Sequence, residues 1–297
     1  MKFDTFREEF DANGLVVLPN VFTDQQLERH TKVVGYARDL YDVKDENGFG
    51  DRIGQLHQRY PELMELACNA EILDFLECIL QDKPLLFGSL NFEKGTQQAI
   101  HVDAIFFWTE PFCSMAGVWI ALEDVDMDNG PLMYIPGSHK WKMIRSEELS
   151  PNDPVTSEIR RDARHEWFND AKRAKLVSEL GNRWTEKYYD MMQANHAEPK
   201  KIALRRGDVV IWHSLLAHGG DVITNKKRSR KSVVYHYIGR KSLLFSFEKF
   251  MLLNRNEFTK QNSEKVNIKN YKNIDYISYP YFVTYNQGEQ VVHNLES

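Results

Sequence analysis

The chain has 297 residues, of which 42% are hydrophobic and 27% are charged; these values are ordinary for a globular protein with a substantial core. The formal net charge is −5, from 43 acidic and 38 basic residues, which argues against a nucleic-acid binder or a binder of anionic membranes because both need a basic surface. Three cysteines without a CxxC pair, no signal-peptide pattern and no apolar run of about 18 residues predict a cytoplasmic protein with no membrane segment.

Residues 1–83 are expected to be mainly helical. The apolar run 14–19 predicts a short strand, and Thr23 with Gln26 has the spacing of a capping box, which predicts a helix that begins there. Residues 60–81 have apolar side chains at helical spacing, interrupted at Asn69, which is expected to cap a second helix.

From residue 84 onward the pattern changes to short β-like runs separated by turn residues, at 84–92, 99–107, 115–125, 131–135, 201–212 and 232–238. This pattern favours a mainly β fold, a sandwich or a barrel, with a core at about 84–140 and 200–240. Residues 141–200 are charged and helical in composition, so we interpret them as an insertion. Residues 241–297 have no clear period before an expected strand at 279–285. One domain over 1–297 is the simplest organisation.

His101 and Asp103 form an HxD motif in one of the predicted strands. Side chains two residues apart in a strand share a face, so this imidazole and this carboxylate can reach one ion. A third ligand from elsewhere would complete the two-histidine, one-carboxylate set that is diagnostic of non-haem Fe(II) oxygenases. An HxD motif alone is weak evidence, because two polar residues on a surface strand give the same pattern.

A second segment strengthens this hypothesis. A turn at Gly207 is followed by a buried strand over 209–212, and His218 comes next, before two glycines that allow a ligand to approach closely. Arg230 lies twelve residues beyond His218 at the start of the next strand. A buried arginine beside an iron site is costly unless it meets a carboxylate, and a dicarboxylate co-substrate would supply one.

The chain resembles the phytanoyl-CoA dioxygenase family, whose fold is a double-stranded β-helix, or jelly roll. The matching residues are 89–95, the HxD motif, 119–124, Asn129–Leu132, Ile135–His139, Gly207-Asp208, His213, His218-Gly219, Asn225 and Arg230. The resemblance implies an Fe(II)- and 2-oxoglutarate-dependent dioxygenase that consumes O₂ and releases succinate and CO₂. Since Asp103 is retained, hydroxylation or another C–H oxidation is expected in place of halogenation.

The resemblance also implies roles for single residues. His101, Asp103 and His218 would bind the iron, Arg230 would hold the distal carboxylate of 2-oxoglutarate, and Asn91 would hydrogen-bond the co-substrate. Gln98 and Trp119 are candidate lining residues of the co-substrate site; a polar loop and a core aromatic residue are the simpler interpretations. We expect His139 and His213 to support the site without binding metal.

Two positions depart from the family pattern. The second residue after the distal histidine is often Ser or Thr in the family, whereas it is Gly220 here. The loop before Arg230 carries Lys226-Lys227-Arg228 in place of the usual proline, so Arg228 is a rival for the co-substrate.

The sequence leaves the primary substrate open. If residues 141–200 form a lid, then Arg160, Arg164 and Trp167 share one helix face, with Arg161 and His165 close by, which suggests a polar or anionic small molecule. A decorated surface helix is the alternative. Two other classes of protein also fit part of the pattern, a metal-dependent hydrolase and a catalytically silent jelly-roll binding protein. The oligomeric state is not indicated.

Overall fold

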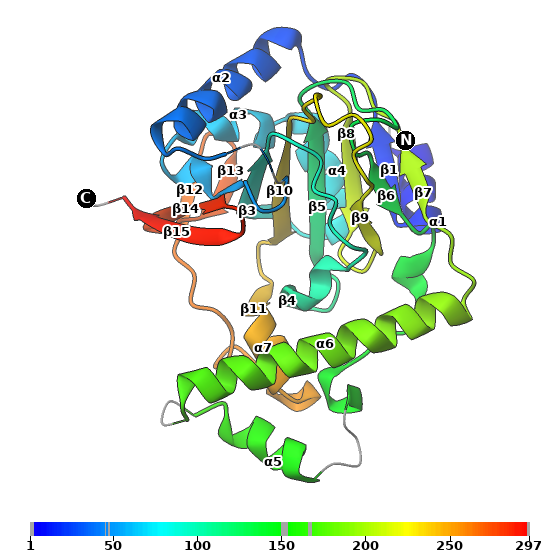
Figure 1. Ribbon diagram of the computed structural model, residues 1–297, viewed down its shortest axis with the longest axis vertical. Helices are drawn as coiled ribbons and strands as arrows, with labels where there is room; N and C mark the ends of the chain where they lie inside the picture. The colour runs from blue at the N-terminus through cyan, green and yellow to red at the C-terminus, as the bar shows by residue number, and fades with distance from the viewer. Residues whose placement is uncertain (1–2, 45, 47, 150–153, 166–167, 296–297) are drawn as a thin grey trace.

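The computed structural model describes residues 3–295 except 45, 47, 150–153 and 166–167 (Figure 1). The described strands form a large sheet with the order β1-β8-β5-β10-β3-β2-β14-β15, to which β13 and β12 are added beside β3, and two smaller sheets, β7-β6-β9 and β11-β4. The strands of the large sheet are β1 (Leu15–Leu18), β2 (Ile53–Gly54), β3 (Pro84–Phe92), β5 (Met115–Ala121), β8 (Val209–His213), β10 (Ser232–Gly239), β12 (Ile268–Tyr271), β13 (Ile274–Ile277), β14 (Tyr281–Asn286) and β15 (Glu289–Asn294). The others are β4 (Phe107–Glu110), β6 (Leu132–Tyr134), β7 (Lys200–Ile202), β9 (His218–Gly220) and β11 (Leu243–Ser246).

The large sheet and the β7-β6-β9 sheet pack against each other through apolar side chains. Trp119, Val210 and Val234 from the large sheet share one buried cluster with Leu132 from the small sheet. The strand pairs around them are antiparallel, including β10 with β3 and β5, and β6 with β9. This arrangement is the predicted mainly β jelly roll.

Helices cover the outer face of the large sheet and extend the molecule beyond one end of it. The outer core joins Phe10 of α1 and Phe75 of α4 to strand residues such as Val118 and Tyr235. The helices are α1 (Asp4–Asn13), α2 (Asp24–Leu40), α3 (Met64–Ala67), α4 (Ala70–Leu80), α5 (Pro154–Asp162), α6 (Asp170–Ala194) and α7 (Phe247–Leu252). In Figure 1, α5 and α6 lie below the sheets, and α6 passes α7.

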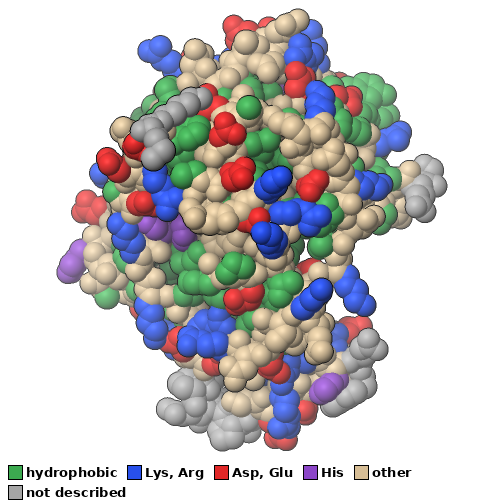
Figure 2. Space-filling view, turned by 180° about the vertical axis from the view of Figure 1, so that it is seen from behind, with side chains coloured by type: hydrophobic (Ala, Val, Ile, Leu, Met, Phe, Trp, Pro, Cys, Tyr) green, Lys and Arg blue, Asp and Glu red, His purple; other side chains and the backbone are tan. Residues whose placement is uncertain are grey.

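On the face drawn in Figure 2, acidic and basic side chains are interspersed over the part that the structure describes. No helix among the described residues is both long enough and apolar enough to cross a membrane.

Most expected elements are present, with one important difference. The capping box of Thr23 and Gln26 and the cap at Asn69 are confirmed, and β3 has the predicted bounds. The expected strand 99–107 is wrong: His101 makes an isolated β-bridge, and Asp103 begins a short 3₁₀ helix (Asp103–Ile105). The insertion is two helices, α5 and α6, and the 241–297 region contains strands that its sequence pattern did not indicate. The assignment of 1–297 to one domain stays a prediction.

Two buried histidines between the N-terminal region and β3 stay neutral in the folded protein. His57 Nδ1 lies 2.7 Å from Ser89 Oγ, and His30 Nε2 lies 3.0 Å from Asn91 Oδ1. Burial lowers the pKa of His57 to about 3 and that of His30 to about 4. In the unfolded chain both have the ordinary pKa of ~6.5.

These lowered pKa values predict acid-sensitive stability. Between pH 7 and pH 5 the unfolded chain takes up a proton at His57 that the folded protein does not, so the free energy of unfolding falls as the pH falls. The loss is about 2 kcal/mol for this one residue. Urea unfolding of the metal-free protein at both pH values should show this decrease, and His57→Gln should reduce it by about the same amount. Equal pH dependence in the two proteins would contradict the prediction.

Candidate metal centre

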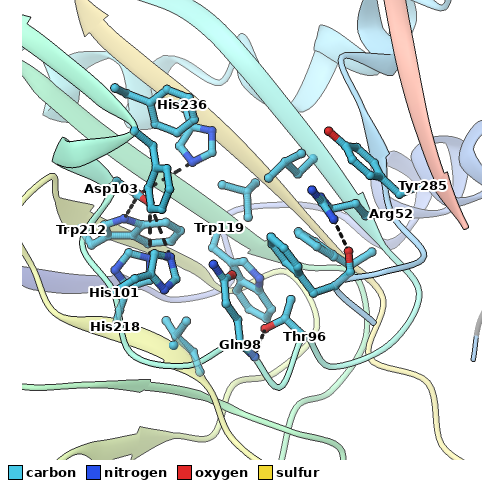
Figure 3. A pocket seen from close by; sticks show the side chains of 18 of the residues that line it. Arg52, Thr96, Gln98, His101, Asp103, Trp119, Trp212, His218, His236 and Tyr285 are labelled. Carbon is cyan, nitrogen blue, oxygen red and sulfur yellow. Dashed lines mark hydrogen bonds and ion pairs between the residues drawn. The ribbon is translucent and has the colours of Figure 1, made fainter. Parts of the chain in front are cut away.

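His101, Asp103 and His218 lie together in the structure, with their ligand atoms all within 4.8 Å of one another. Oδ1 of Asp103 is 3.7 Å from His101 Nε2 and 3.8 Å from His218 Nε2 (Figure 3). The two histidines are neighbours because their backbones pair: each amide donates to the carbonyl of the other, at 2.9 and 3.0 Å. Val102 has an extended backbone, which returns Asp103 to the same side.

The polar atoms that face away from this centre are all engaged. Nδ1 of His101 lies 2.9 Å from the Ala99 carbonyl, and Nδ1 of His218 lies 2.9 Å from the Leu216 carbonyl. A carbonyl can only accept, so each Nδ1 carries the proton and each Nε2 is left with a lone pair. Trp212 Nε1 donates to Asp103 Oδ2 at 2.8 Å, which leaves Oδ1 for a cation. The donor set therefore fits a divalent metal.

The electrostatics favour the metal-binding forms of these side chains. Burial lowers the pKa of His101 to about 4, with a further contribution from His218. Burial alone would raise the pKa of Asp103, but the surrounding histidines and the Trp212 hydrogen bond outweigh it, so the pKa lies below its usual range. His101 therefore presents a neutral imidazole and Asp103 an ionised carboxylate.

A third histidine, His236 of β10, lies beside the centre. Its Nε2 is 3.8 Å from Asp103 Oδ2, and its ring stacks on Phe87. Sequence reasoning missed His236, although an alternating pattern along β10 places it on the same face as Val234, which lines the pocket.

Arg230 lies in the same pocket as the three predicted ligands and is 1% exposed. Its Nη1 donates to the Gly130 carbonyl at 3.1 Å, and its guanidinium lies 5.4 Å from the ring centre of Trp119. Its Nε has no hydrogen-bond partner among the residues that the structure describes. Burial lowers its pKa to about 10. Arg228, the rival, makes an ion pair with Asp126 outside this pocket.

The family motifs hold the ends of the pocket in place. Asn129 donates to the carbonyls of Asp124 and Ser229, at 3.0 and 3.1 Å, so the loop of Gly130 is tied to the residue before Arg230. Ser138 Oγ accepts from the amide of Ala217 at 2.9 Å, next to His218. Through these contacts the segment Asn129–Leu132 holds the backbone next to Arg230, and the segment Ile135–His139 holds the backbone next to His218.

Gln98 and Trp119, the two candidate lining residues, do line the pocket, and Thr96 lines it beside them. Thr96 Oγ1 occupies the space that a Cβ at position 220 would fill. A hydroxyl is thus present beside Gly220 although residue 220 itself has none.

Asn91 does not reach the pocket. It lies on β3 between the lining residues Leu90 and Phe92, so its side chain points to the opposite face, where Oδ1 contacts His30. Asn91 is therefore not placed to hydrogen-bond a co-substrate in this pocket, contrary to the expectation.

The arginines of the insertion also lie away from the pocket. Arg160 is buried and donates to the Met251 carbonyl and to Ser146 Oγ, and Arg164 makes an ion pair with Glu257. Trp167 is outside the described residues. The idea of two guanidiniums facing the substrate from this segment is wrong, because Arg160 attaches α5 to α7 and to Ser146, and Arg164 attaches the turn after α5 to Glu257.

His139 and His213 lie next to each other, with ring centres 5.2 Å apart, and are not pocket-lining residues. His213 Nδ1 accepts from the Leu215 amide. His213 therefore supports the backbone at Leu215, and His139 packs against its ring.

The comparisons with known proteins agree with this geometry. The family model described as phytanoyl-CoA dioxygenase (PhyH) matches residues 10–232. The chain belongs to this family. Family membership confirms the predicted class, a 2-oxoglutarate-dependent non-haem iron dioxygenase.

Relatives of this PhyH-family chain cover most of its length. The "Phytanoyl-CoA dioxygenase domain-containing protein 1 homolog" of Caenorhabditis elegans is 24% identical over 295 residues, which is 82% of this chain and 94% of that protein. The peroxisomal phytanoyl-CoA dioxygenase of Bos taurus is 25% identical over 259 residues, 78% and 67% of the two chains.

Solved structures share the fold. The carbocyclase SnoK from nogalamycin biosynthesis has a TM-score of 0.59 at 17% identity and covers 81% of this chain and 85% of its own. EctD from S. alaskensis, crystallised with 2-oxoglutarate and 5-hydroxyectoine, has a TM-score of 0.58 at 17% identity and covers 84% and 83%.

The Trp212–Asp103 hydrogen bond predicts a specific loss of metal affinity. Trp212→Phe removes the donor that orients Asp103, so iron should bind about 10- to 100-fold more weakly. Anaerobic titration with Fe(II) measures this change. Trp119→Phe is the matched control, because Trp119 lines the same pocket next to Arg230 and should leave iron affinity unchanged. Unchanged affinity in Trp212→Phe would refute the orienting role.

Proposed function

We propose that this chain oxidises a C–H bond of a small organic molecule with Fe(II), 2-oxoglutarate and O₂, and that His101, Asp103 and His218 hold the iron. The convergence of the two Nε2 atoms and Asp103 Oδ1 supports this assignment most strongly, because every other polar atom of these side chains is engaged. When bound, the metal would supply O₂ activation coupled to conversion of 2-oxoglutarate to succinate and CO₂.

Arg230 is the proposed partner of the distal carboxylate of 2-oxoglutarate. A buried guanidinium whose Nε has no partner is costly, and a carboxylate would satisfy it with charge-assisted hydrogen bonds. Thr96, Gln98 and Trp119 line the same pocket; we propose that they position the co-substrate, with the Thr96 hydroxyl in the space beside Gly220.

A metal-dependent hydrolase and a silent binding protein are the alternative functions. A hydrolase mechanism has no evident use for the buried guanidinium of Arg230 beside the metal ligands, which disfavours it. An assay separates the three functions, because only the dioxygenase releases succinate in an iron- and oxygen-dependent manner.

The proposed substrate is a small molecule with a polar or anionic group. Since Arg160 and Arg164 lie elsewhere, the support for an anionic group comes from a different arginine, Arg52, which lines the pocket. The cytoplasmic location stays a prediction.

The metal assignment predicts what its removal does. Asp103→Ala and His218→Ala should lose iron binding and lower iron-dependent succinate release from 2-oxoglutarate by at least about 100-fold, because a two-ligand site holds the ion poorly. Succinate formation and bound iron are measured on each purified variant, with circular dichroism to confirm folding. His196→Ala, an exposed histidine just after the end of α6, is the control. Full iron content and turnover in either ligand variant would refute the assignment.

The two candidate arginines predict opposite effects. Arg230→Ala removes a charge-assisted contact of about 3 kcal/mol in a dry pocket and should raise the KM for 2-oxoglutarate by ~10²-fold. Arg228→Ala breaks only a surface ion pair with Asp126 and should change the KM less than about twofold. Succinate release as a function of 2-oxoglutarate concentration measures both. The reverse pattern would transfer the co-substrate role to Arg228.

A further inference from the structure

A second cavity adjoins the metal pocket. The metal pocket has a volume of about 430 Å³ and the second cavity about 390 Å³; both are typical of small-molecule sites. We call them the metal lobe and the second lobe. The residues that line both are Leu90, Phe106, Phe107, His236 and Tyr285. Since His236 also lies beside Asp103, the two lobes meet next to the metal centre.

Arg52 is a second cation of the metal lobe. Its guanidinium lies between two aromatic rings, 3.8 Å from the ring centre of Phe49 and 3.6 Å from that of Tyr285, and it donates to the Phe49 carbonyl. Among the described residues, the only side chain whose charge or hydrogen bond raises the pKa of Arg52 is Tyr285, and no carboxylate does so; burial outweighs it and lowers this pKa. Figure 3 shows Arg52 and Tyr285 across the pocket from His101 and His218.

The charges of this lobe exceed what the co-substrate can neutralise. Under the proposed function, the carboxylates of 2-oxoglutarate belong to the metal and to Arg230. Arg52 then remains as a partly buried cation without an anionic partner, which is costly unless another ligand supplies one. The rings of Phe49 and Tyr285 fix the orientation of the Arg52 guanidinium. The guanidinium is therefore already positioned to bind an anionic ligand.

The second lobe is suited to an apolar body. Its walls include Phe87, Leu244, Phe245, Tyr279, Tyr281 and Val283. The acidic residue there, Glu264, is already paired with Lys249 at 2.9 Å, and Lys265 is exposed to solvent. Most of these walls come from residues after 232, where the family match ends, so the shape of this lobe is set by the C-terminal segment of this chain.

Gly88 keeps the second lobe open. It lies on β3 opposite His236 and lines the lobe. A Cβ at this position would lie 3.4 Å from His236 Nδ1 and 3.6 Å from His236 Cβ, which is ordinary contact. The backbone there is not left-handed, so neither conformation nor crowding requires glycine, and a larger side chain would fill the lobe.

From these observations, and on the basis of the proposed function, we infer that the primary substrate is an elongated organic anion. Its acidic group binds Arg52, its apolar body occupies the second lobe, and the carbon to be oxidised lies where the lobes meet, beside His236 and Phe107. This assignment deepens the proposed function by naming the substrate class.

Decanoate and its uncharged amide, decanamide, test this inference. Calorimetric titration into anaerobic protein saturated with Fe(II) and 2-oxoglutarate should show decanoate binding at least about tenfold more tightly than decanamide. Arg52→Gln should remove this preference, whereas Arg59→Gln, an exposed arginine near Tyr60, should retain it. Gly88→Leu should weaken both probes by about tenfold or more, and Gly88→Ala should weaken them less.

Affinity for 2-oxoglutarate, measured first on every variant, separates this inference from the proposed function. Failure of the wild type to bind 2-oxoglutarate with Fe(II) would refute the proposed function itself. With that binding intact, equal affinity for the two probes, or no measurable binding of decanoate at millimolar concentration, would overturn the inference. So would a loss of 2-oxoglutarate affinity in Arg52→Gln, which would assign Arg52 to the co-substrate, or a retained preference combined with lower thermal stability, which would make its role structural. Normal binding of both probes by Gly88→Leu would place the apolar body elsewhere.

Discussion

The carboxylate of Asp103 is the constraint around which the site is built. It is 5% exposed, so its charge must be satisfied inside the protein. Trp212 from the large sheet donates to one oxygen, and the histidines His101 and His218 face the other. Because the small sheet contributes His218 and the large sheet contributes Trp212 and His236, both sheets must keep their spacing for the carboxylate to remain paired. The jelly roll is therefore the frame that holds one buried charge between two layers.

Contacts from two motif segments fix the backbone beside Arg230 and beside His218. Asn129 ties the Gly130 loop to the backbone beside Arg230, and Ser138 ties the turn after β6 to the residue before His218. Each motif thus fixes the backbone next to one functional side chain. Arg230 is the second buried charge of the site, and among the described residues its Nε has no hydrogen-bond partner, whereas both oxygens of Asp103 face donor groups. This difference indicates that Arg230 is the charge whose hydrogen bonds a bound molecule completes.

Much of this site could be predicted from the sequence because its parts lie in short, recognisable segments. The HxD pair, the glycines after His218 and the spacing to Arg230 indicated the ligand set, and the β-like run over 84–92 predicted β3 correctly. The face of β3 on which each residue lies could not be decided this way, since Asn91 is polar and yet points to His30 in a buried contact.

Residues brought to the pocket by long-range contacts escaped prediction. Arg52 reaches it only because β2 pairs with both β3 and β14, and no local pattern reports that pairing. The prediction for the arginines of the insertion was wrong for a different reason. Arg160 does lie on a helix, but α5 turns its side chain toward Met251 and away from the pocket. Local periodicity gives the face of a helix and leaves its partner undetermined.

The location of the metal tests the central claim most directly. A crystal grown anaerobically with Fe(II) and 2-oxoglutarate, measured with anomalous scattering at the iron edge, should place one iron on His101 Nε2, His218 Nε2 and Asp103 Oδ1. The distal carboxylate of 2-oxoglutarate should then lie against Arg230, with Trp212 still bonded to Asp103 Oδ2. Iron bound through His236 in place of one of these ligands, or a co-substrate turned away from Arg230, would contradict the account.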